Sequence, residues 1–110
     1  MMMQKKVDVT VPKELILANE LQKIGDYELS RKTYQDFFDA NPMHILRFKA
    51  LFEVADNLYH AGRYVEARQG YLKFLEYCAS QEDLSADESG WVEAYTDLSN
   101  SRLRTIKKGL

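Results

Sequence analysis

Cysteine, proline and glycine are scarce in this sequence, and long apolar runs are missing. Cys78 is the only cysteine among 110 residues, so no disulfide can form within the chain, and a reducing compartment is the simplest context. Two prolines and five glycines leave room for long helices. No stretch approaches the roughly 18–20 apolar residues of a membrane span, and no signal-peptide pattern follows the N-terminus. These absences predict a soluble, cytoplasmic protein that has no membrane partner.

Residue patterns that carry catalysis or bind metals are also missing. His44 and His60 lie too far apart on one predicted helix to share a metal ion, and Cys78 has no second cysteine to pair with. The sequence contains no glycine-rich phosphate loop, no GxSxG and no HExxH. Cys78 falls on an apolar stripe beside Phe74 and Leu75, which favours a buried small side chain over a nucleophile. We therefore expect no enzymatic activity, no metal and no cofactor.

The charge balance argues against nucleic acid as a partner. The chain has 17 acidic and 15 basic residues, which gives a net charge of −2 and a pI of about 5.7. A domain that binds nucleic-acid phosphates is usually basic. An RNA-binding helical repeat is therefore a disfavoured third possibility, which requires the basic C-terminal residues to lie beside exposed aromatics such as Tyr95.

The strongest positive feature is an internal repeat. Gly25-Asp26-Tyr27 returns as Gly62-Arg63-Tyr64, a step of 37 residues (62 − 25). The same step superimposes Ala18 on Ala55, Leu21 on Leu58, Arg31 on Arg68, Tyr34 on Tyr71 and Phe37 on Phe74. An internal repeat of this length is typical of stacked helical hairpins, with one hairpin per repeat.

Helical periodicity and helix-end signals predict five helices. Pro12 suits a first helical turn, and the repeated glycines suit C-terminal caps. Asn41 before Pro42 breaks one helix and is a good N-cap for the next. Ser85 and Glu88 form a capping-box pattern. The predicted helices cover 12–24, 28–40, 42–61, 64–79 and 86–107.

The inner stripe of the first helix appears three times, but its turn appears only twice. The stripe consists of Leu17, Ala18, Leu21 and Ile24, then Val54, Ala55, Leu58 and Ala61, then Trp91, Val92, Tyr95 and Leu98. Ser99 and Ser101 replace the third Gly and Tyr, so we expect one long final helix that closes the array. Cations favour a helix C-terminus, which explains the basic residues at its end: Arg102, Arg104, Lys107 and Lys108.

These features resemble the tetratricopeptide repeat (TPR) over roughly residues 11–81, with a degenerate third unit. The matching positions are Leu17-Ala18-x2-Leu21 with Ser30-x3-Tyr34 and Pro42, and Val54-Ala55-x2-Leu58 with Ala67-x3-Tyr71. The resemblance implies an all-α, right-handed superhelix of two helical hairpins and a long C-terminal capping helix. Its single domain would cover 12–110, with unit one at 12–41, unit two at 42–79 and the capping helix at 86–107.

The residues outside this pattern give two further expectations. Residues 1–11 would be a tail, in which Val7, Val9 and Val11 alternate with polar residues and favour either a strand or a frayed terminus. The repeat step exceeds the usual 34 residues of the family by about one helical turn. A lengthened third helix would absorb these residues without changing its inner face.

The resemblance also implies a concave groove lined by the first helix of each unit. The partner-binding residues would be Leu15, Asn19, Gln22, Lys49, Phe52, Asp56, Tyr59, Glu93 and Thr96, with Lys23, His60, Ser89 and Asp97 beside them. TPR domains that hold acidic chaperone tails use a clamp of Lys, two Asn, Lys and Arg. Those slots hold Leu15, Asn19, Glu53, Ala86 and Gly90 here. Because only Asn19 matches, a chaperone-tail adaptor is disfavoured.

Two functions follow, from different classes. The first is a non-enzymatic interaction module, such as an adaptor, chaperone or regulator, that binds a protein or peptide. With Asp56 and Phe52 in the groove, that peptide would carry a basic and an apolar anchor; the plain alternative is a row of ordinary solvated positions. The second function is a homodimer formed through the N-terminal end, near Leu29, Phe38 and residues 7–11, which has no visible cap.

Overall fold

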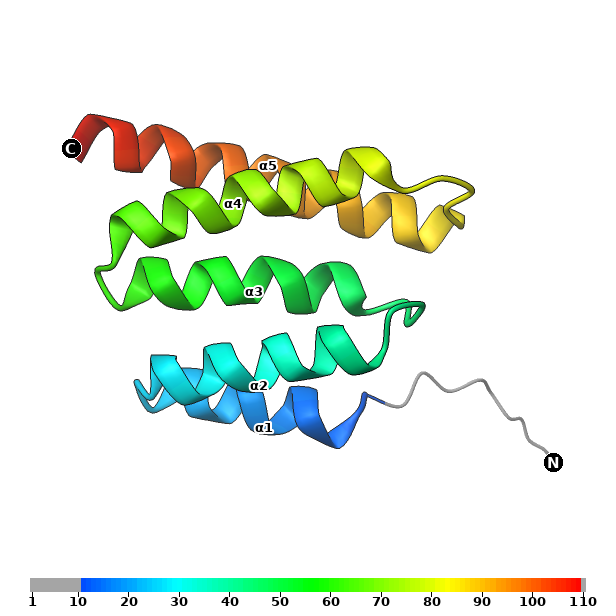
Figure 1. The fold of residues 1–110 in the computed structure, drawn as a ribbon, viewed down its shortest axis with the longest axis horizontal. Coiled ribbons are helices and arrows are strands. Elements are labelled where there is room, and N and C mark those ends of the chain that lie inside the picture. Colours follow the sequence, from blue (N-terminus) through cyan, green and yellow to red (C-terminus); the bar gives the residue numbers. More distant parts are fainter. Residues whose placement is uncertain (1–10, 110) are drawn as a thin grey trace, which may run out of the picture.

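The structure, a computed structural model, describes residues 11–109, and within these residues it contains only helices (Figure 1). The five helices are α1 (Lys13–Lys23), α2 (Tyr27–Ala40), α3 (Arg47–His60), α4 (Tyr64–Ser80) and α5 (Ala86–Gly109). The predicted all-α class and the number of helices are confirmed for this part of the chain. The predicted tail lies outside the described residues, apart from Val11.

Each helix packs against the next one along the chain, and α3 also contacts α5. Figure 1 shows the helices side by side, with α3 between α2 and α4 and with α1 and α5 at opposite edges of the row. The molecule therefore has one central helix, α3, which contacts α2, α4 and α5, and two edge helices.

Both repeated glycines adopt the backbone conformation that the repeat predicts. Gly25 has φ +86° and Gly62 has φ +79°, a left-handed conformation in which a side chain would be strained. The N–H of Asp26 donates to the carbonyl of Leu21 at 2.9 Å, and the turn at Gly62 has the equivalent bond. These bonds are those of a Schellman motif, which ends a helix and turns the chain back. Each glycine thus sets the start of the next helix.

The connection between α2 and α3 differs from the prediction. Residues 41–46 form turns, so α3 begins at Arg47 and not near Pro42. The prediction of Asn41 as an N-cap was wrong, because its side-chain Nδ2 donates to the carbonyl of Phe37 at 2.9 Å and so ends α2. The extra residues of the repeat therefore lie in this connection, and α3 is not lengthened.

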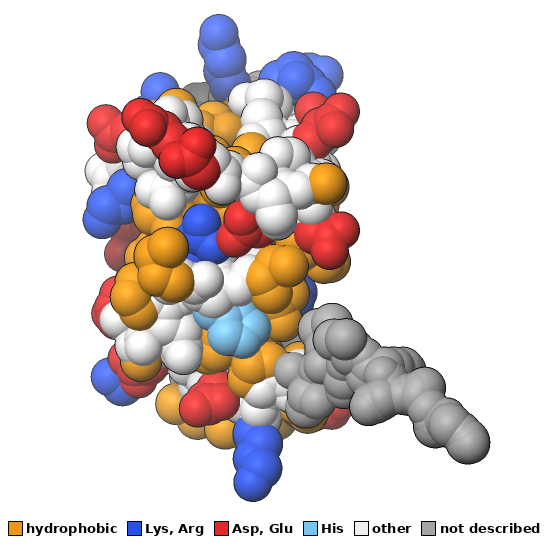
Figure 2. Space-filling view, turned by 90° about the vertical axis from the view of Figure 1, so that its right-hand side faces the viewer, with side chains coloured by type: hydrophobic (Ala, Val, Ile, Leu, Met, Phe, Trp, Pro, Cys, Tyr) orange, Lys and Arg blue, Asp and Glu red, His pale blue; other side chains and the backbone are white. Residues whose placement is uncertain are grey.

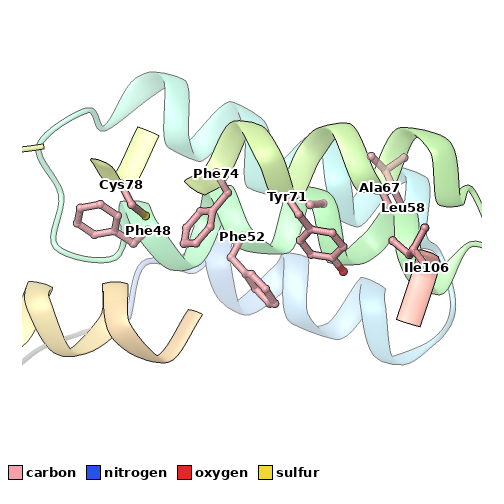
Figure 3. Packing of buried hydrophobic residues seen from close by; sticks show 9 residues of the cluster. Phe48, Phe52, Leu58, Ala67, Tyr71, Phe74, Cys78 and Ile106 are labelled. Atoms are coloured by element: carbon pink, nitrogen blue, oxygen red, sulfur yellow. The ribbon is translucent and has the colours of Figure 1, made fainter. Parts of the chain in front are cut away.

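The largest core cluster lies between α3, α4 and α5. Its buried members are Phe48, Phe52, Ala55, Leu58, Ala67, Tyr71, Phe74, Cys78 and Ile106, and Figure 3 shows Ile106 of α5 reaching Leu58 and Ala67. α4 passes close to α3 at Gly70, where an added Cβ would lie 2.8 Å from the Cβ of Ala55. Ala55, which the repeat superimposes on Ala18, is small enough to allow this approach.

A second, smaller cluster joins α1 and α2 to the start of α3. Its buried residues are Leu15, Ala18, Tyr34, Phe37, Leu46 and Ala50. The predicted inner stripe of α1 is only partly inside, because Leu17 is 53% exposed and Ile24 is 76% exposed. Phe38 contacts Tyr77 of α4 and so does not lie at the free N-terminal end. Burial depends on a covering neighbour, and no described element lies outside α1.

The start of α5 has the predicted capping box. The N–H of Glu88 donates to Ser85 Oγ at 3.1 Å, and the N–H of Ser85 donates to Glu88 Oε1 at 3.0 Å. The helix then runs without interruption past Ser99 to Gly109. The prediction of one long final helix is confirmed.

Candidate protein-interaction surfaces

The residues predicted to line a concave groove do not form one open surface. Leu15, Phe52 and Asp56 are buried, and the last two are only 2% and 5% exposed. Asn19, Gln22, Lys49, Tyr59 and Thr96 are half-buried, whereas Glu93 is exposed, as are Lys23, His60, Ser89 and Asp97. The reason is α5, which packs directly against α3. Asp56 and Phe52, which were expected to bind the basic and the apolar anchor of a peptide, lie underneath α5.

Asp56 is the centre of a buried polar network. Arg102 Nε of α5 donates to its Oδ1 at 2.9 Å, the Tyr71 hydroxyl donates to the same oxygen, and His60 Nε2 lies 3.1 Å from Oδ2. The hydrogen bond with Asp56 raises the pKa of Arg102. Burial, together with this carboxylate, raises the pKa of Tyr71. The expectation of an exposed acidic floor at Asp56 is thus corrected, since the basic group it binds comes from the chain's own α5.

The sequence assigned Arg102 a different role, at the basic C-terminal end of the helix. Its guanidinium lies 4.8 Å from the ring centroid of Tyr59, so it stacks on an aromatic side chain of α3 as well as pairing with Asp56. Arg102 and Asp56 lie 46 residues apart in the sequence. The only sequence signal for this ion pair was that a carboxylate and an arginine fall on the inner faces of two neighbouring helices.

Phe52 is covered by an aromatic stack from α5. The ring centroids of Phe52 and Tyr95 are 4.8 Å apart, and those of Tyr95 and Trp91 are 6.0 Å apart, nearly parallel at 12°. Phe52 also contacts Phe74 within the core (Figure 3). Phe52, predicted to line the groove, is therefore part of the core. Tyr95 is half-buried and is not an exposed aromatic beside the basic residues.

The part of the concave face between α1 and α3 is polar and internally bonded. Gln22 Nε2 donates to Glu53 Oε1 at 3.0 Å, and Lys49 Nζ donates to Glu53 Oε2 at 3.1 Å. A ligand would have to replace these hydrogen bonds before it could form its own. Glu53 occupies one of the clamp positions, and its negative charge there would repel an acidic tail.

On the other side of the helix row, α2 and α4 enclose an open groove above α3. We call it the α2–α4 groove; its volume is about 590 Å³. Leu51, Val54 and Leu58 of α3 line it with apolar groups, α2 adds Arg31, Gln35 and Phe38, and α4 adds Glu66, Gln69, Gly70, Lys73 and Tyr77. Leu51 and Val54, which are half-buried, are thus reachable from solvent, whereas Leu58 is buried and belongs to the main core cluster.

Two contacts of α2, one with Arg63 just before α4 and one with α4 itself, mark the length of this groove. Near one end, Arg63 pairs with Glu28 at 2.9 Å and with Glu66 at 2.7 Å. At the other end, the rings of Phe38 and Tyr77 meet edge to face, with centroids 5.2 Å apart. The ten residues from Glu28 to Phe38 span about 15 Å of helix. That length fits three turns of a helix or about five residues of extended chain.

The charged residues at the groove differ in their partners. Arg31 pairs with Glu28, and Glu66 pairs with Arg63, which lowers the pKa of Glu66. Lys73 is exposed and has no carboxylate within ion-pair distance among residues 11–109. The rim therefore offers one cation for a carboxylate on a ligand.

A second hollow, of about 500 Å³, lies at the end of the molecule where the α2–α3 and α4–α5 connections meet. It is lined by Ile45, Leu46, Ala86, Asp87, Gly90, Trp91 and Ala94. Figure 2 views this end and shows scattered hydrophobic side chains among charged ones. Its lining has one charged group, so it offers fewer specific contacts than the α2–α4 groove.

Below this hollow, a buried arginine that the sequence did not single out ties three elements together. Arg47 Nη1 lies 2.6 Å from Glu88 Oε2, and Nε donates to the Tyr77 hydroxyl at 3.0 Å. The guanidinium also covers the ring of Phe48 at 4.4 Å. Hydrogen bonds from Ser85 and from Arg47 lower the pKa of Glu88. The charge of Arg47 is thereby satisfied inside the protein and is not a binding site.

In the described part of the chain, the cysteine is buried and the side chains that could bind a metal do not gather into a site. Cys78 is buried in the main core cluster, and its burial raises the pKa of the thiol to about 11, which leaves it protonated at neutral pH. Within residues 11–109, no three side chains of His, Cys, Asp or Glu gather as a metal site. In the same range, no helix combines the length and apolar character that crossing a bilayer requires.

We compared the chain with models of known protein families, with curated proteins and with solved structures, and none of them matches it. Its own repeat and its own surfaces therefore carry the functional argument.

Proposed function

We propose that this chain is a TPR-like, non-enzymatic interaction module of the cytoplasm that binds a segment of a partner protein in the α2–α4 groove. One observation carries the proposal: three apolar side chains of the central helix, Leu51, Val54 and Leu58, line an open groove between two helices. Apolar groups at the base of a cleft with polar groups on its rim are typical of sites that bind peptides and small ligands.

The TPR-like part of the proposal is supported by the repeat. The two glycine turns have the same conformation, and the repeat-related Ser30 and Ala67 are both fully buried. Tyr34 and Tyr71, the next repeat-related pair, are also fully buried. Positions that coincide in the sequence thus coincide in backbone shape and in burial, as stacked repeats require.

The α2–α4 groove is a better candidate than the concave face because its side chains are less engaged. On the concave face, Asp56 and Glu53 already have bonded partners within the chain. In the groove, Lys73 has no ion-pair partner among the described residues, and the apolar base needs no rearrangement to be reached. Binding there costs less reorganisation.

The chemistry of the groove specifies its occupant. A segment of one to three helical turns, with two apolar side chains on one face, would cover Leu51 and Val54. An Asp or Glu at the edge of that face would pair with Lys73 at the rim. The partner segment is therefore apolar and acidic, in place of the basic and apolar anchors expected for the concave face.

Peptide selection tests this proposal. A displayed library of random peptides of about 12 residues, which is about 18 Å as a helix, is selected against the full chain. We expect enriched peptides that combine apolar pairs with an acidic residue, and Lys73→Glu should weaken them at least about fivefold (roughly 1 kcal/mol). Lys32→Glu, an equally exposed charge reversal on α2 outside the groove, is the matched control.

Methyl chemical-shift changes then locate the bound peptide. Changes confined to Leu51, Val54 and Leu58 would support the groove. Enriched peptides that respond equally to both charge reversals, or that shift residues of the concave face such as Thr96, would refute it. An outcome without any enriched peptide would count against the binding function itself.

A further inference from the structure

The outward face of α1 carries three large aliphatic side chains, and no helix within residues 11–109 covers it. We call Lys13, Ile16, Leu17, Glu20 and Ile24 the α1 outer face. At 100° per residue these five lie on one side of the helix, opposite the buried Leu15 and Ala18. Ile16 is 52% exposed, and Leu17 and Ile24 are more exposed still. Three large aliphatic side chains on one exposed stripe are more than the scattered apolar residues of an ordinary surface.

The internal repeat indicates that this face is a helix-contact face. Leu17 corresponds to Val54 in the second unit. Val54 packs against the cluster formed by α1, α2 and the start of α3 and lies at the base of the groove between α2 and α4. The same position is thus flanked by a preceding helix in unit two but lies at the free edge in unit one (Figure 1). Within residues 11–109, no helix occupies the equivalent place beside Leu17.

The charges of Lys13 and Glu20 are symmetric about the midpoint between Ile16 and Leu17. Lys13 precedes Ile16 by three residues, and Glu20 follows Leu17 by three residues. When two copies of α1 pair antiparallel about the midpoint between Ile16 and Leu17, Lys13 of each copy faces Glu20 of the other. Ile16 of each copy then faces Leu17 of the other. A face that is complementary to itself is the requirement for a two-fold symmetric contact.

We infer that α1 is the interface of a homodimer, in which the outer faces of two copies pair antiparallel. The ion pair that Glu20 makes within its own copy, with Lys23 at 3.7 Å, joins two highly exposed side chains and leaves the carboxylate accessible. The inference is independent of the proposed peptide groove, which lies on the other side of α2. One short helix per copy makes a small interface, so the dimer should be reversible, with a dissociation constant in the micromolar range.

Sedimentation of the full chain over a concentration series tests this inference. The unmodified protein should show a reversible monomer–dimer equilibrium. Leu17→Lys should raise the dissociation constant at least about tenfold, because it places a charge in the centre of the contact. Lys13→Glu or Glu20→Lys alone should weaken the dimer, because like charges then face each other twice. The double variant, Lys13→Glu with Glu20→Lys, should recover most of the affinity.

Glu14→Lys is the matched control. This residue is exposed on α1 but lies about 100° away from the outer face, so its reversal should leave the equilibrium unchanged. All these positions are exposed, and circular dichroism should show unchanged helicity in each variant. A chain that is monomeric at every accessible concentration overturns the inference and leaves the α1 outer face to residues 1–10 or to a different protein. A dimer in which the double reversal is no better than the single ones excludes the antiparallel arrangement.

Discussion

The two edges of the helix row, α1 and α5, begin from the same position of the repeat and end in opposite states. α5 has 24 residues, and buried or half-buried arginines tie it down at both ends, through Arg47–Glu88 and Arg102–Asp56. α1 has 11 residues, no side-chain cap and an apolar outer face. At the α5 edge, side chains of α5 cover the core, whereas at the α1 edge Ile16, Leu17 and Ile24 are exposed to solvent. The terminal units of helical repeat proteins usually have a polar outer face, whereas the outer face of α1 includes these three exposed aliphatic side chains.

The largest expected difference between the two edges concerns their apolar side chains. Phe52→Ala should lower the free energy of unfolding by about 3–5 kcal/mol, because it leaves a cavity between α3, α4 and α5. Leu17→Ala is the matched change at the other edge and should cost at most about 0.5 kcal/mol at low protein concentration, since Leu17 is exposed. Urea unfolding measures both. Equal losses would mean that the α1 outer face is already covered in the monomer.

The second prediction concerns the network that fixes α5 to α3. Asp56→Ala should destabilise the protein by about 3 kcal/mol, because it removes the shared acceptor of Tyr71 and Arg102. Hydrogen exchange in α5 should accelerate, whereas exchange in α1 should change little. Tyr71→Phe, which removes one donor and keeps the ring, should cost only about 1 kcal/mol. If exchange rises equally at both edges, the network does not hold α5 in particular.

The contrast between the edges also shows where the sequence was informative. Gly25 and Gly62 end their helices because a local conformation needs glycine, so the turns could be predicted from the sequence alone. The absence of a third glycine predicted the length of α5 in the same way. Local chemistry therefore determined the order and approximate bounds of the helices.

The contacts of the candidate sites could not be predicted in this way. Asp56 has the periodicity of a groove residue, and only the packing of α5 makes it a buried partner of Arg102. Leu17 has the periodicity of a core residue, but it is exposed because no helix in the described part of the chain covers it. The turns at 41–46 depend on Asn41, whose side chain hydrogen-bonds to the preceding helix. An asparagine side chain can equally bond to the residues that follow it, so the sequence alone does not decide between the two. Whether a side chain is buried depends on which elements pack against it, and a single sequence does not show which elements those are.

The third prediction uses pH at the start of α5. Hydrogen bonds lower the pKa of Glu88 in the folded protein, so this carboxylate contributes stability above the unfolded glutamate pKa, about 4.3. That contribution is lost as the pH falls through the folded pKa. Glu88→Gln should therefore cost about 2 kcal/mol at pH 7, because Arg47 loses a charged partner, and the difference from the unmodified protein should vanish under acid conditions.

Glu93→Gln is the matched control for this pH profile, since Glu93 is exposed on the same helix. Its unfolding free energy should follow that of the unmodified protein within about 0.5 kcal/mol at every pH. A Glu88→Gln difference that persists at low pH would assign its effect to packing and not to the charge of Glu88.

The smallest expected effect concerns the start of α1. Pro12 occupies the N-cap position there and forms no side-chain hydrogen bond, whereas α5 has a complete capping box. Pro12→Asp should supply the missing acceptor for the first N–H groups of α1 and a favourable charge at its N-terminus. The net gain should be about 0.5 kcal/mol, because the loss of the proline ring frees the unfolded chain.

Pro12→Ala separates these two effects, because it removes the ring without adding an acceptor. In urea unfolding, the Pro12→Asp variant should be more stable than the Pro12→Ala variant by about 1 kcal/mol. A gain of this size would show that the α1 edge is weak in its helix start as well as in its uncovered side chains. If aspartate and alanine are equally stable at this position, the start of α1 is not limiting. The difference between the edges then resides in the α1 outer face, which a cap cannot cover and a second copy can.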